Sequence, residues 1–361
     1  MSAAEARNFE DFGDPNGRRI LNLISSGGMG SKVHFVQIGD SHTAGDFFTD
    51  RLRVRLQEEL GDGGLGWAMP MFANGQRLAR IGYDQSGFQL ASSRTKLDED
   101  YPVGGLIAMG SGAAGELTIK SKDGRNPIQN VAMLINQGPY DPPLILSDAD
   151  GKRLEINSDI VESHWSSRKF TARLPYTLRI QGSPTTRIGG WWLSNDRPGA
   201  IVSALGINGA ELSHWSRWRP GWVQDLAVGK PDIVAIAYGT NEAFRDTLST
   251  DQFRQNLETA VDHLRQQIPG VSVLIIGAPE SLASLNGPCG RRPPSLDSVQ
   301  AIQRSVALQR HTLYWDWQAA MGGACSMKGW VNRGWARKDG VHFSKDGYET
   351  AADDLFRGLN G

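Results

Sequence analysis

An apolar segment, residues 33–38, ends abruptly at Gly39-Asp40-Ser41, and this junction constrains the fold more than any other feature of the chain. The segment is too short for a helix and is bounded by a breaker, as expected of a buried parallel strand. Downstream, four apolar residues with a spacing of four, at positions 48, 52, 56 and 60, predict a helix. The sequence therefore predicts that Ser41 lies on a tight strand-to-helix turn, beside the unpaired amides of a helix N-terminus.

The C-terminal half of the chain alternates strand-like and helix-like segments. Four apolar runs have the length of buried strands, at residues 200–205, 232–238, 271–276 and 312–315. Helices are expected between and after them, at residues 253–268, 296–306 and 346–359. Capping boxes are expected to open the first of these helices at Ser249 and the last at Asp346. Strands that alternate with helices are typical of a parallel sheet covered on both faces, so the sequence predicts an α/β fold with five parallel strands.

The stretch between these parts has a different character. From about residue 80 to about residue 192 the helical periodicity disappears, and short β-rich runs recur between turn signals such as Lys122-Asp123-Gly124. These runs lie at residues 105–108, 116–120, 131–136, 143–146, 153–156, 170–174 and 176–180. Short strands at this spacing predict a β-sandwich. Because the α/β pattern resumes afterwards, we expect an inserted domain over residues 81–192, with residues 1–80 and 193–361 forming the other domain.

Composition excludes several classes of function. The chain has 361 residues, of which 39% are hydrophobic and 21% charged, as in an ordinary globular protein. With 38 basic and 39 acidic residues the net charge is only -1, so nucleic-acid binding is unsupported. The sequence contains no apolar run long enough for a membrane span and no signal-peptide core in its first thirty residues. Its start fits either a cytoplasmic protein or a mature form expressed without its leader.

Chemically useful side chains follow the predicted strands. In a doubly wound sheet the ligand site lies beyond the carboxyl ends of the strands. The first strand delivers Ser41 there, the second Gly209 and the third Asn241, while the loop before the last helix delivers Asp339 and His342. A serine, an Asp/His pair and amide donors are the parts required for acyl transfer.

Each of these residues also has a simpler explanation. Asn241 and Gly209 are ordinary turn residues, and an Asp and a His three positions apart are common. Among the seven histidines, however, only His342 has a nearby carboxylate on a loop of the right sense. His42 directly follows the serine, but on such a turn it is expected to point away from the site.

Taken together, these blocks resemble the SGNH, or GDSL-like, hydrolase superfamily. Ser41, Gly209 and Asn241 match the serine, glycine and asparagine of its first three blocks, and Asp339 with His342 matches its DxxH block. The resemblance implies a flavodoxin-like, doubly wound, five-stranded sheet and a catalytic triad of Ser41, His342 and Asp339. It also implies an oxyanion hole made by the amides of Ser41 and Gly209 and the Asn241 side chain. Such a mechanism needs no metal or organic cofactor.

The β-rich insertion narrows the resemblance. Together with the stretches 38–46 and 237–242, it is similar to the peptidoglycan O-acetylesterases of Gram-negative bacteria. That similarity implies an inserted module like carbohydrate-binding domains and a substrate of O-acetylated peptidoglycan or a related acetylated glycan. It further implies removal of the 6-O-acetyl group of N-acetylmuramic acid in the periplasm. In that oxidising compartment Cys289 and Cys325 are expected to form a disulfide. Without the resemblance, two unrelated thiols are an equally good interpretation of these cysteines.

Two other functions remain open at this stage. A polysaccharide O-acetyltransferase uses the same triad and differs in whether a sugar hydroxyl outcompetes water. A non-catalytic glycan-binding protein is disfavoured because all five site residues are present. The eleven tryptophans suit sugar stacking, but aromatic residues more often belong to the core; they include residues 191, 192, 215, 218 and 222.

Overall fold

The computed structural model describes residues 8–28, 30–158, 164–183 and 185–361, and the chain divides into two compact units. The α/β unit comprises Met1–Asp62, Pro198–Ser213 and Pro231–Gly361, and the β-rich unit comprises Gly63–Arg197 and His214–Lys230. The β-rich unit therefore begins earlier than the expected residue 81, since the strand β3 (Gly66–Ala68) pairs with a strand of that unit. It also takes in residues 214–230, because the indole N–H of Trp192 donates to the Asp225 carbonyl at 3.1 Å.

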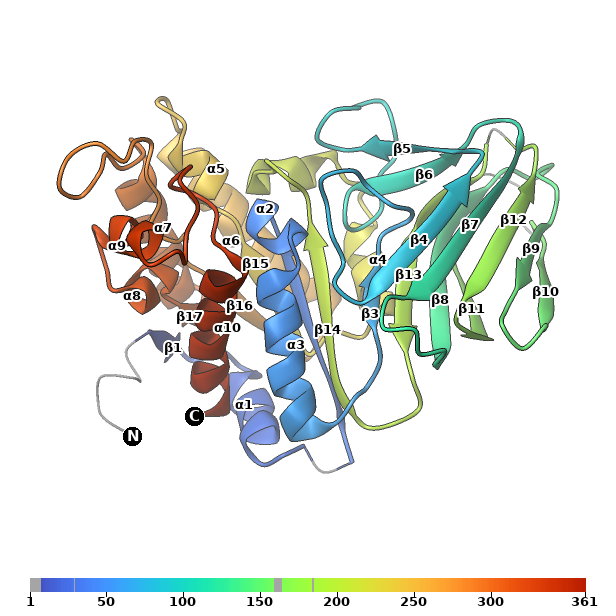
Figure 1. The fold of residues 1–361 in the computed structure, drawn as a ribbon, viewed down its shortest axis with the longest axis horizontal. Coiled ribbons are helices and arrows are strands. Elements are labelled where there is room, and N and C mark those ends of the chain that lie inside the picture. The colour runs from blue at the N-terminus through green and yellow to red at the C-terminus, as the bar shows by residue number, and fades with distance from the viewer. Residues whose placement is uncertain (1–7, 29, 159–163, 184) are drawn as a thin grey trace. The chain divides into compact units, whose positions relative to one another are not determined.

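One sheet forms the centre of the α/β unit, with the strand order β1-β17-β16-β15-β2-β14 (Figure 1). Its strands are β1 (Phe9–Asp11), β2 (Lys32–Gly39), β14 (Gly199–Gly206), β15 (Ile233–Ala237), β16 (Ser272–Ile276) and β17 (Leu313–Trp315). Five of them are parallel, and numbered along the chain they follow the order 2-1-3-4-5. The sixth, β1, is antiparallel to β17, so the expectation of five strands was wrong by one. With three half-buried or exposed residues, β1 has no apolar run from which it could be predicted.

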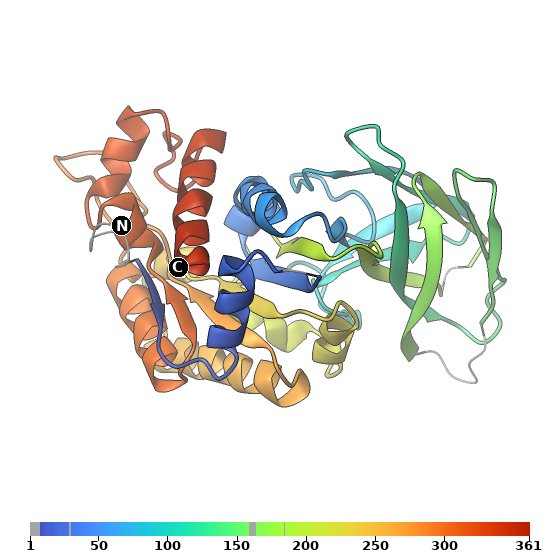
Figure 2. The same cartoon turned by 90° about the horizontal axis from the view of Figure 1, so that it is seen from below.

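Helices cover both faces of this sheet. Figures 1 and 2 show α1, α3 and α10 on one face and α6 and α7 on the other. On the first face, Phe35 of β2, Phe48 of α3 and Leu355 of α10 belong to one buried cluster, as the four-residue apolar spacing of α3 predicts. The helices of the unit are α1 (Gly17–Ser25), α2 (Ser41–Ala44), α3 (Phe47–Leu60), α5 (Thr240–Ala243), α6 (Thr250–Gln267), α7 (Leu296–Gln309), α8 (Trp317–Met321), α9 (Ser326–Asn332) and α10 (Lys345–Asn360).

The two expected helix caps have different outcomes. The Ser249 side chain accepts a hydrogen bond from the Gln252 amide at 3.3 Å and so caps α6 as expected. The last helix is capped two residues earlier than expected, because Ser344 is its N-cap and accepts from the Gly347 amide at 3.3 Å. Asp346 therefore lies in the first turn, where a carboxylate interacts favourably with the helix dipole.

The β-rich unit contains two antiparallel sheets. The first has the order β10-β9-β12-β7-β4, and the second has the order β11-β8-β13-β6-β5, with β3 paired to β13. The ring of Tyr176 lies 6.0 Å from that of Phe170 and 5.6 Å from that of Trp191, so side chains of the two sheets pack together as in a sandwich. The strands are β4 (Ile81–Ser86), β5 (Phe88–Ser92), β6 (Leu106–Gly110), β7 (Ala114–Ser121), β8 (Ile128–Gln137), β9 (Leu144–Ser147), β10 (Arg153–Ile156), β11 (His164–Arg173), β12 (Tyr176–Gln181) and β13 (Arg187–Ser194).

The tryptophans singled out in the sequence belong to the core. Trp191 is fully buried, and Trp192 is nearly so. The rings of Trp215, Trp218 and Trp222 pack on one another with centroids 4.7 to 5.4 Å apart, around the 3-10 helix η2 (Leu212–Arg217) and α4 (Trp222–Val228). These side chains therefore do not form a surface for sugar stacking. Among the described residues, no helix is long and apolar enough to cross a membrane.

Candidate active site

Three loops of the α/β unit leave the sheet at the same level. Gly39 at the end of β2 is paired with Gly206 of β14 on one side and with Ala237 of β15 on the other. A Cβ on Gly39 would lie 2.4 Å from the Ala237 carbonyl oxygen, so only glycine fits there. The loops that carry Ser41, Gly209 and Asn241 therefore begin side by side, as the sequence predicts.

Ser41 is the first residue of the short helix α2. Asp40 caps this helix, and its carboxyl accepts a hydrogen bond from the His42 amide at 2.9 Å. Burial raises the pKa of Asp40 to about 7. The cap fixes the turn that presents the Ser41 hydroxyl.

A continuous chain of hydrogen bonds joins Ser41 to Asp339 through His342. The distance from Ser41 Oγ to His342 Nε2 is 3.0 Å, and His342 Nδ1 lies 2.9 Å from Asp339 Oδ2. These are the distances required for the imidazole to take the hydroxyl proton while the carboxylate holds the opposite nitrogen. The three residues predicted as a triad are thus brought together.

The turn around Asp339 organises its own carboxylate. Asp339 Oδ1 accepts from the amides of Val341 at 2.8 Å and His342 at 2.9 Å. Partial burial acts to raise the pKa of Asp339, but these two bonds and the His342 ring together hold it below its ordinary value. Gly340, at φ +73°, supplies the left-handed backbone that this turn needs.

The other two predicted amide donors, Gly209 and Asn241, also lie close together. Asn241 Nδ2 donates to the Ala210 carbonyl at 2.8 Å, which places its side chain against the turn that contains Gly209. Gly209 has a φ of +70°, so a residue without Cβ is favoured there. An amide NH2 carries two hydrogens, so this bond orients Asn241 while using one of them.

Glu242 connects two loops of the candidate site, a role that the sequence analysis did not predict. Its buried carboxyl accepts from the Leu212 amide at 2.8 Å and from the Gly239 amide at 3.0 Å. It therefore links the Asn241 loop to the segment that follows Gly209. Burial raises its pKa to about 8. A glutamate three residues after Gly239, at the start of a helix, is the sequence signal that could have identified its contact with the Gly239 amide.

His42 points into the core, as expected. Its ring is 2% exposed, and Nδ1 lies 2.9 Å from the hydroxyl of Tyr348 on α10. Its ring centroid is 5.6 Å from that of His342. Burial lowers the pKa of His42 to about 3, so the ring is neutral and supports His342 by packing.

The disulfide expected between Cys289 and Cys325 is present, with the two Cα atoms 4.7 Å apart. It joins the segment after β16 to the residue before α9, within the α/β unit.

Comparisons with known proteins place the chain among described families. The family model described as the N-terminal part of peptidoglycan O-acetylesterase matches residues 63–177, and the GDSL-like lipase/acylhydrolase model matches residues 170–350. A solved structure titled "Peptidoglycan O-acetylesterase in action, 5 min" is 40% identical, covers 97% of both chains and has a TM-score of 0.88. An acetyl xylan esterase is 17% identical over 44% of this chain and 79% of that chain, with a TM-score of 0.36. No curated protein matched the chain in the sequence comparison.

These matches span almost the whole chain, and the GDSL-like model includes the loops of Gly209, Asn241 and His342. The parallel sheet with helices on both faces fits the α/β fold of GDSL-like esterases. The chain therefore belongs to the peptidoglycan O-acetylesterase family, within the GDSL-like lipases and acylhydrolases.

Proposed function

We propose that this protein is a serine esterase that removes the 6-O-acetyl group from N-acetylmuramic acid in peptidoglycan, through an acetyl-enzyme formed on Ser41. The observation that carries the proposal is the bonded chain from Ser41 Oγ through His342 to Asp339, beside the Asn241 amide. In the first step His342 Nε2 takes the hydroxyl proton as Ser41 Oγ attacks the acetyl carbonyl. Asp339 holds the His342 tautomer and stabilises the imidazolium that forms.

The tetrahedral oxyanion would be held by the amides of Ser41 and Gly209 and by the Asn241 side chain. Each donor of this kind contributes roughly 3 kcal/mol to lowering the barrier. His342 then protonates the sugar oxygen as the ester bond breaks, which leaves the acetyl group on Ser41. In the second half of the reaction His342 activates a water molecule, and acetate is released.

The substrate assignment rests on the family. The relative that is 40% identical carries peptidoglycan O-acetylesterase in its title, and the match extends through both units of this chain. The substrate assignment is tested by measuring acetate release from O-acetylated peptidoglycan. The same material, de-acetylated by mild base, is the control. Acetate released from the first and not from the second supports the substrate; release from an aryl acetate but not from peptidoglycan would refute it.

For the β-rich unit we propose a glycan-binding role, at a cleft of about 420 Å³. Its lining combines aromatic and cationic side chains, among them Phe72, Tyr83 and Lys120. Phe72 is 48% exposed, which suits stacking on a sugar ring. Phe72→Ala should weaken binding of the full chain to insoluble peptidoglycan by about fivefold. Tyr140→Ala is the matched control, because Tyr140 is 97% exposed and does not line the cleft; an equal loss in both variants would refute the assignment.

The proposed compartment is the periplasm. The disulfide between Cys289 and Cys325 supports an oxidising environment, since such bonds persist outside the cytoplasm. Peptidoglycan, the proposed substrate, also lies outside the cytoplasmic membrane. Cell fractionation, with a periplasmic and a cytoplasmic marker, tests this assignment.

A further inference from the structure

A buried carboxyl that takes no part in the proposed acyl transfer lies in the segment after β16. Glu280 is completely buried. Its Oε1 forms an ion pair with Arg292 Nε at 2.9 Å and accepts from the Cys325 amide at 3.2 Å, while its Oε2 accepts from Gln318 Nε2 at 2.5 Å. One side chain thus joins the segment after β16 to α8 and to the residue that precedes α9.

Covalent and backbone bonds reinforce the same junction. The disulfide ties Cys289, in the segment after β16, to Cys325. Between Glu280 and Arg292 the chain turns back on itself, because the Ala283 amide donates to the Arg291 carbonyl at 2.7 Å. Lys328 of α9 donates to the Gly287 carbonyl. The segment 280–292 is therefore held on α8 and α9 by several independent contacts.

This segment touches the turn that carries Asp339 and His342. The Leu282 amide donates to the Gly340 carbonyl at 2.7 Å. A Cβ on Gly340 would lie 2.9 Å from the Leu282 carbonyl oxygen, so the two backbones are in close contact. A second contact comes from α9, where the Trp330 ring packs edge-on against Phe343 at 5.3 Å. Phe343 directly follows His342 in the chain.

We propose that Glu280, with the Cys289–Cys325 disulfide, is a positioning residue that fixes the Asp339–His342 turn for catalysis. The inference rests on the function proposed above, in which His342 is the base for Ser41. The side chains of Asp339 and His342 are 45% and 36% exposed, so packing around them alone holds them weakly. A displacement of about 1 Å at the base costs on the order of a hundredfold in rate. Backbone support from Leu282 therefore sets kcat without touching the substrate.

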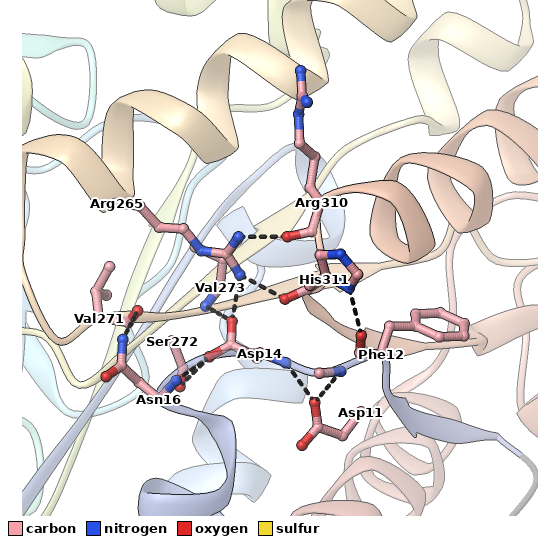
Figure 3. A network of polar contacts seen from close by, with 11 residues as sticks. Asp11, Phe12, Asp14, Asn16, Arg265, Val271, Ser272, Val273, Arg310 and His311 are labelled. Carbon is pink, nitrogen blue, oxygen red and sulfur yellow. Dashed lines mark hydrogen bonds and ion pairs between the residues drawn. The ribbon is translucent and has the colours of Figure 1, made fainter.

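The first test compares Glu280→Ala with a matched control, Asp14→Ala. Asp14 is an equally buried carboxylate of the α/β unit, and Figure 3 shows its contacts with Arg265, Ser272 and Val273. It binds the start of β16, at the end of the strand away from the candidate site. Both changes remove the buried carboxylate that pairs with a half-buried arginine, so a merely structural role predicts similar effects.

Each variant is assayed on an aryl acetate about 20 °C below its own Tm. Glu280→Ala should lower kcat by about 10- to 100-fold with KM within about twofold, and labelling of Ser41 by a fluorophosphonate should slow in parallel. Asp14→Ala should leave kcat and the labelling rate within about twofold. A folded Glu280→Ala with the kcat of the unaltered protein would overturn the proposal, as would equal losses of kcat in both variants.

A second measurement uses the unaltered protein, so it does not depend on the folding of a variant. Reduction of the disulfide in the unaltered protein should lower kcat by at least about threefold with KM unchanged, and reoxidation should restore it. An unchanged kcat in the reduced, folded protein would overturn the proposal even if Glu280→Ala cannot be prepared. The variant Ser41→Ala distinguishes a failure of the proposed function from a failure of the positioning role. If Ser41→Ala remains active, the proposed function is wrong. If Ser41→Ala is inactive but Glu280→Ala is fully active, only the positioning role is wrong.

Discussion

The buried carboxyl of Glu242 accepts a hydrogen bond from the Leu212 amide at 2.8 Å and so ties together the two loops that carry Asn241 and Gly209. Because burial raises the pKa of Glu242 to about 8, its carboxyl stays protonated near neutral pH. In the unfolded chain a glutamate loses its proton near pH 4.3. Between these values the folded state binds more protons, so this residue makes stability fall as the pH rises.

That fall can be measured between pH 6.5 and 8. Denaturant unfolding should show a decreasing free energy of unfolding over this window, with a slope from Glu242 of up to about 1.4 kcal/mol per pH unit. Glu242→Gln, which cannot ionise, should flatten the decrease, although it loses one acceptor and is less stable overall. Equal slopes in the two proteins would show that Glu242 is already ionised in the folded state over this range, so that its pKa is not raised.

Tyr348 gives a prediction about His42, the imidazole that packs beside His342. Tyr348→Phe removes the partner of His42 Nδ1, and an unpaired buried group costs about 1 to 3 kcal/mol. Because His42 is neutral and buried, we expect a loss of stability with kcat on an aryl acetate changed by less than about threefold. Thermal unfolding and steady-state kinetics measure the two effects. A large loss of kcat with unchanged stability would instead give His42 a direct part in the reaction.

The disulfide should contribute to stability as well as to positioning. Its residues are 36 apart in the sequence, and closing a loop of that length contributes roughly 3 to 4 kcal/mol in the chain-entropy model. The double variant Cys289→Ser/Cys325→Ser should lose about this amount in denaturant unfolding. Ellman's reagent should find no thiol in the denatured, non-reduced protein; two reacting thiols would show that the bond does not form.

Hydrolysis should dominate over transfer of the acetyl group. The turn beside the site, Asn208-Gly209-Ala210, consists of small residues that cannot form an apolar lid, whereas a transferase must keep water from its acetyl-enzyme. With an acetyl donor and a large excess of chitooligosaccharide or peptidoglycan fragments, free acetate should account for nearly all of the donor consumed. Acetylated sugar as the main product would favour the transferase.

The sequence was most informative where a local pattern of residues determines the backbone conformation. The run that ends at Gly39-Asp40-Ser41 and the apolar spacing of α3 predicted the turn that carries Ser41, since periodicity and breakers are local signals. The strand β1 was missed because it is short and has no apolar pattern. Likewise the strand β13 carries Gly189 and Gly190 with a register shift beside them, which weakens any strand signal.

Contacts between distant segments could not be predicted from pattern. Glu242 with Leu212, and Glu280 with Cys325, depend on the fold bringing separate loops together. A carboxylate in a loop has no local feature that distinguishes a buried clamp from a solvated side chain. The candidate residues Ser41, Gly209 and Asn241 could be placed together from the sequence because each follows a strand that ends at the same sheet edge.

The most direct test of the account is the activity of Ser41→Ala on O-acetylated peptidoglycan. Ser41 Oγ is the atom that lies 3.0 Å from His342 Nε2, so its removal should abolish the acetyl-enzyme while leaving the fold intact. We predict that kcat for acetate release falls by at least about a thousandfold, with circular dichroism and Tm unchanged. A well-folded Ser41→Ala that still releases acetate at the rate of the unaltered protein would contradict the account.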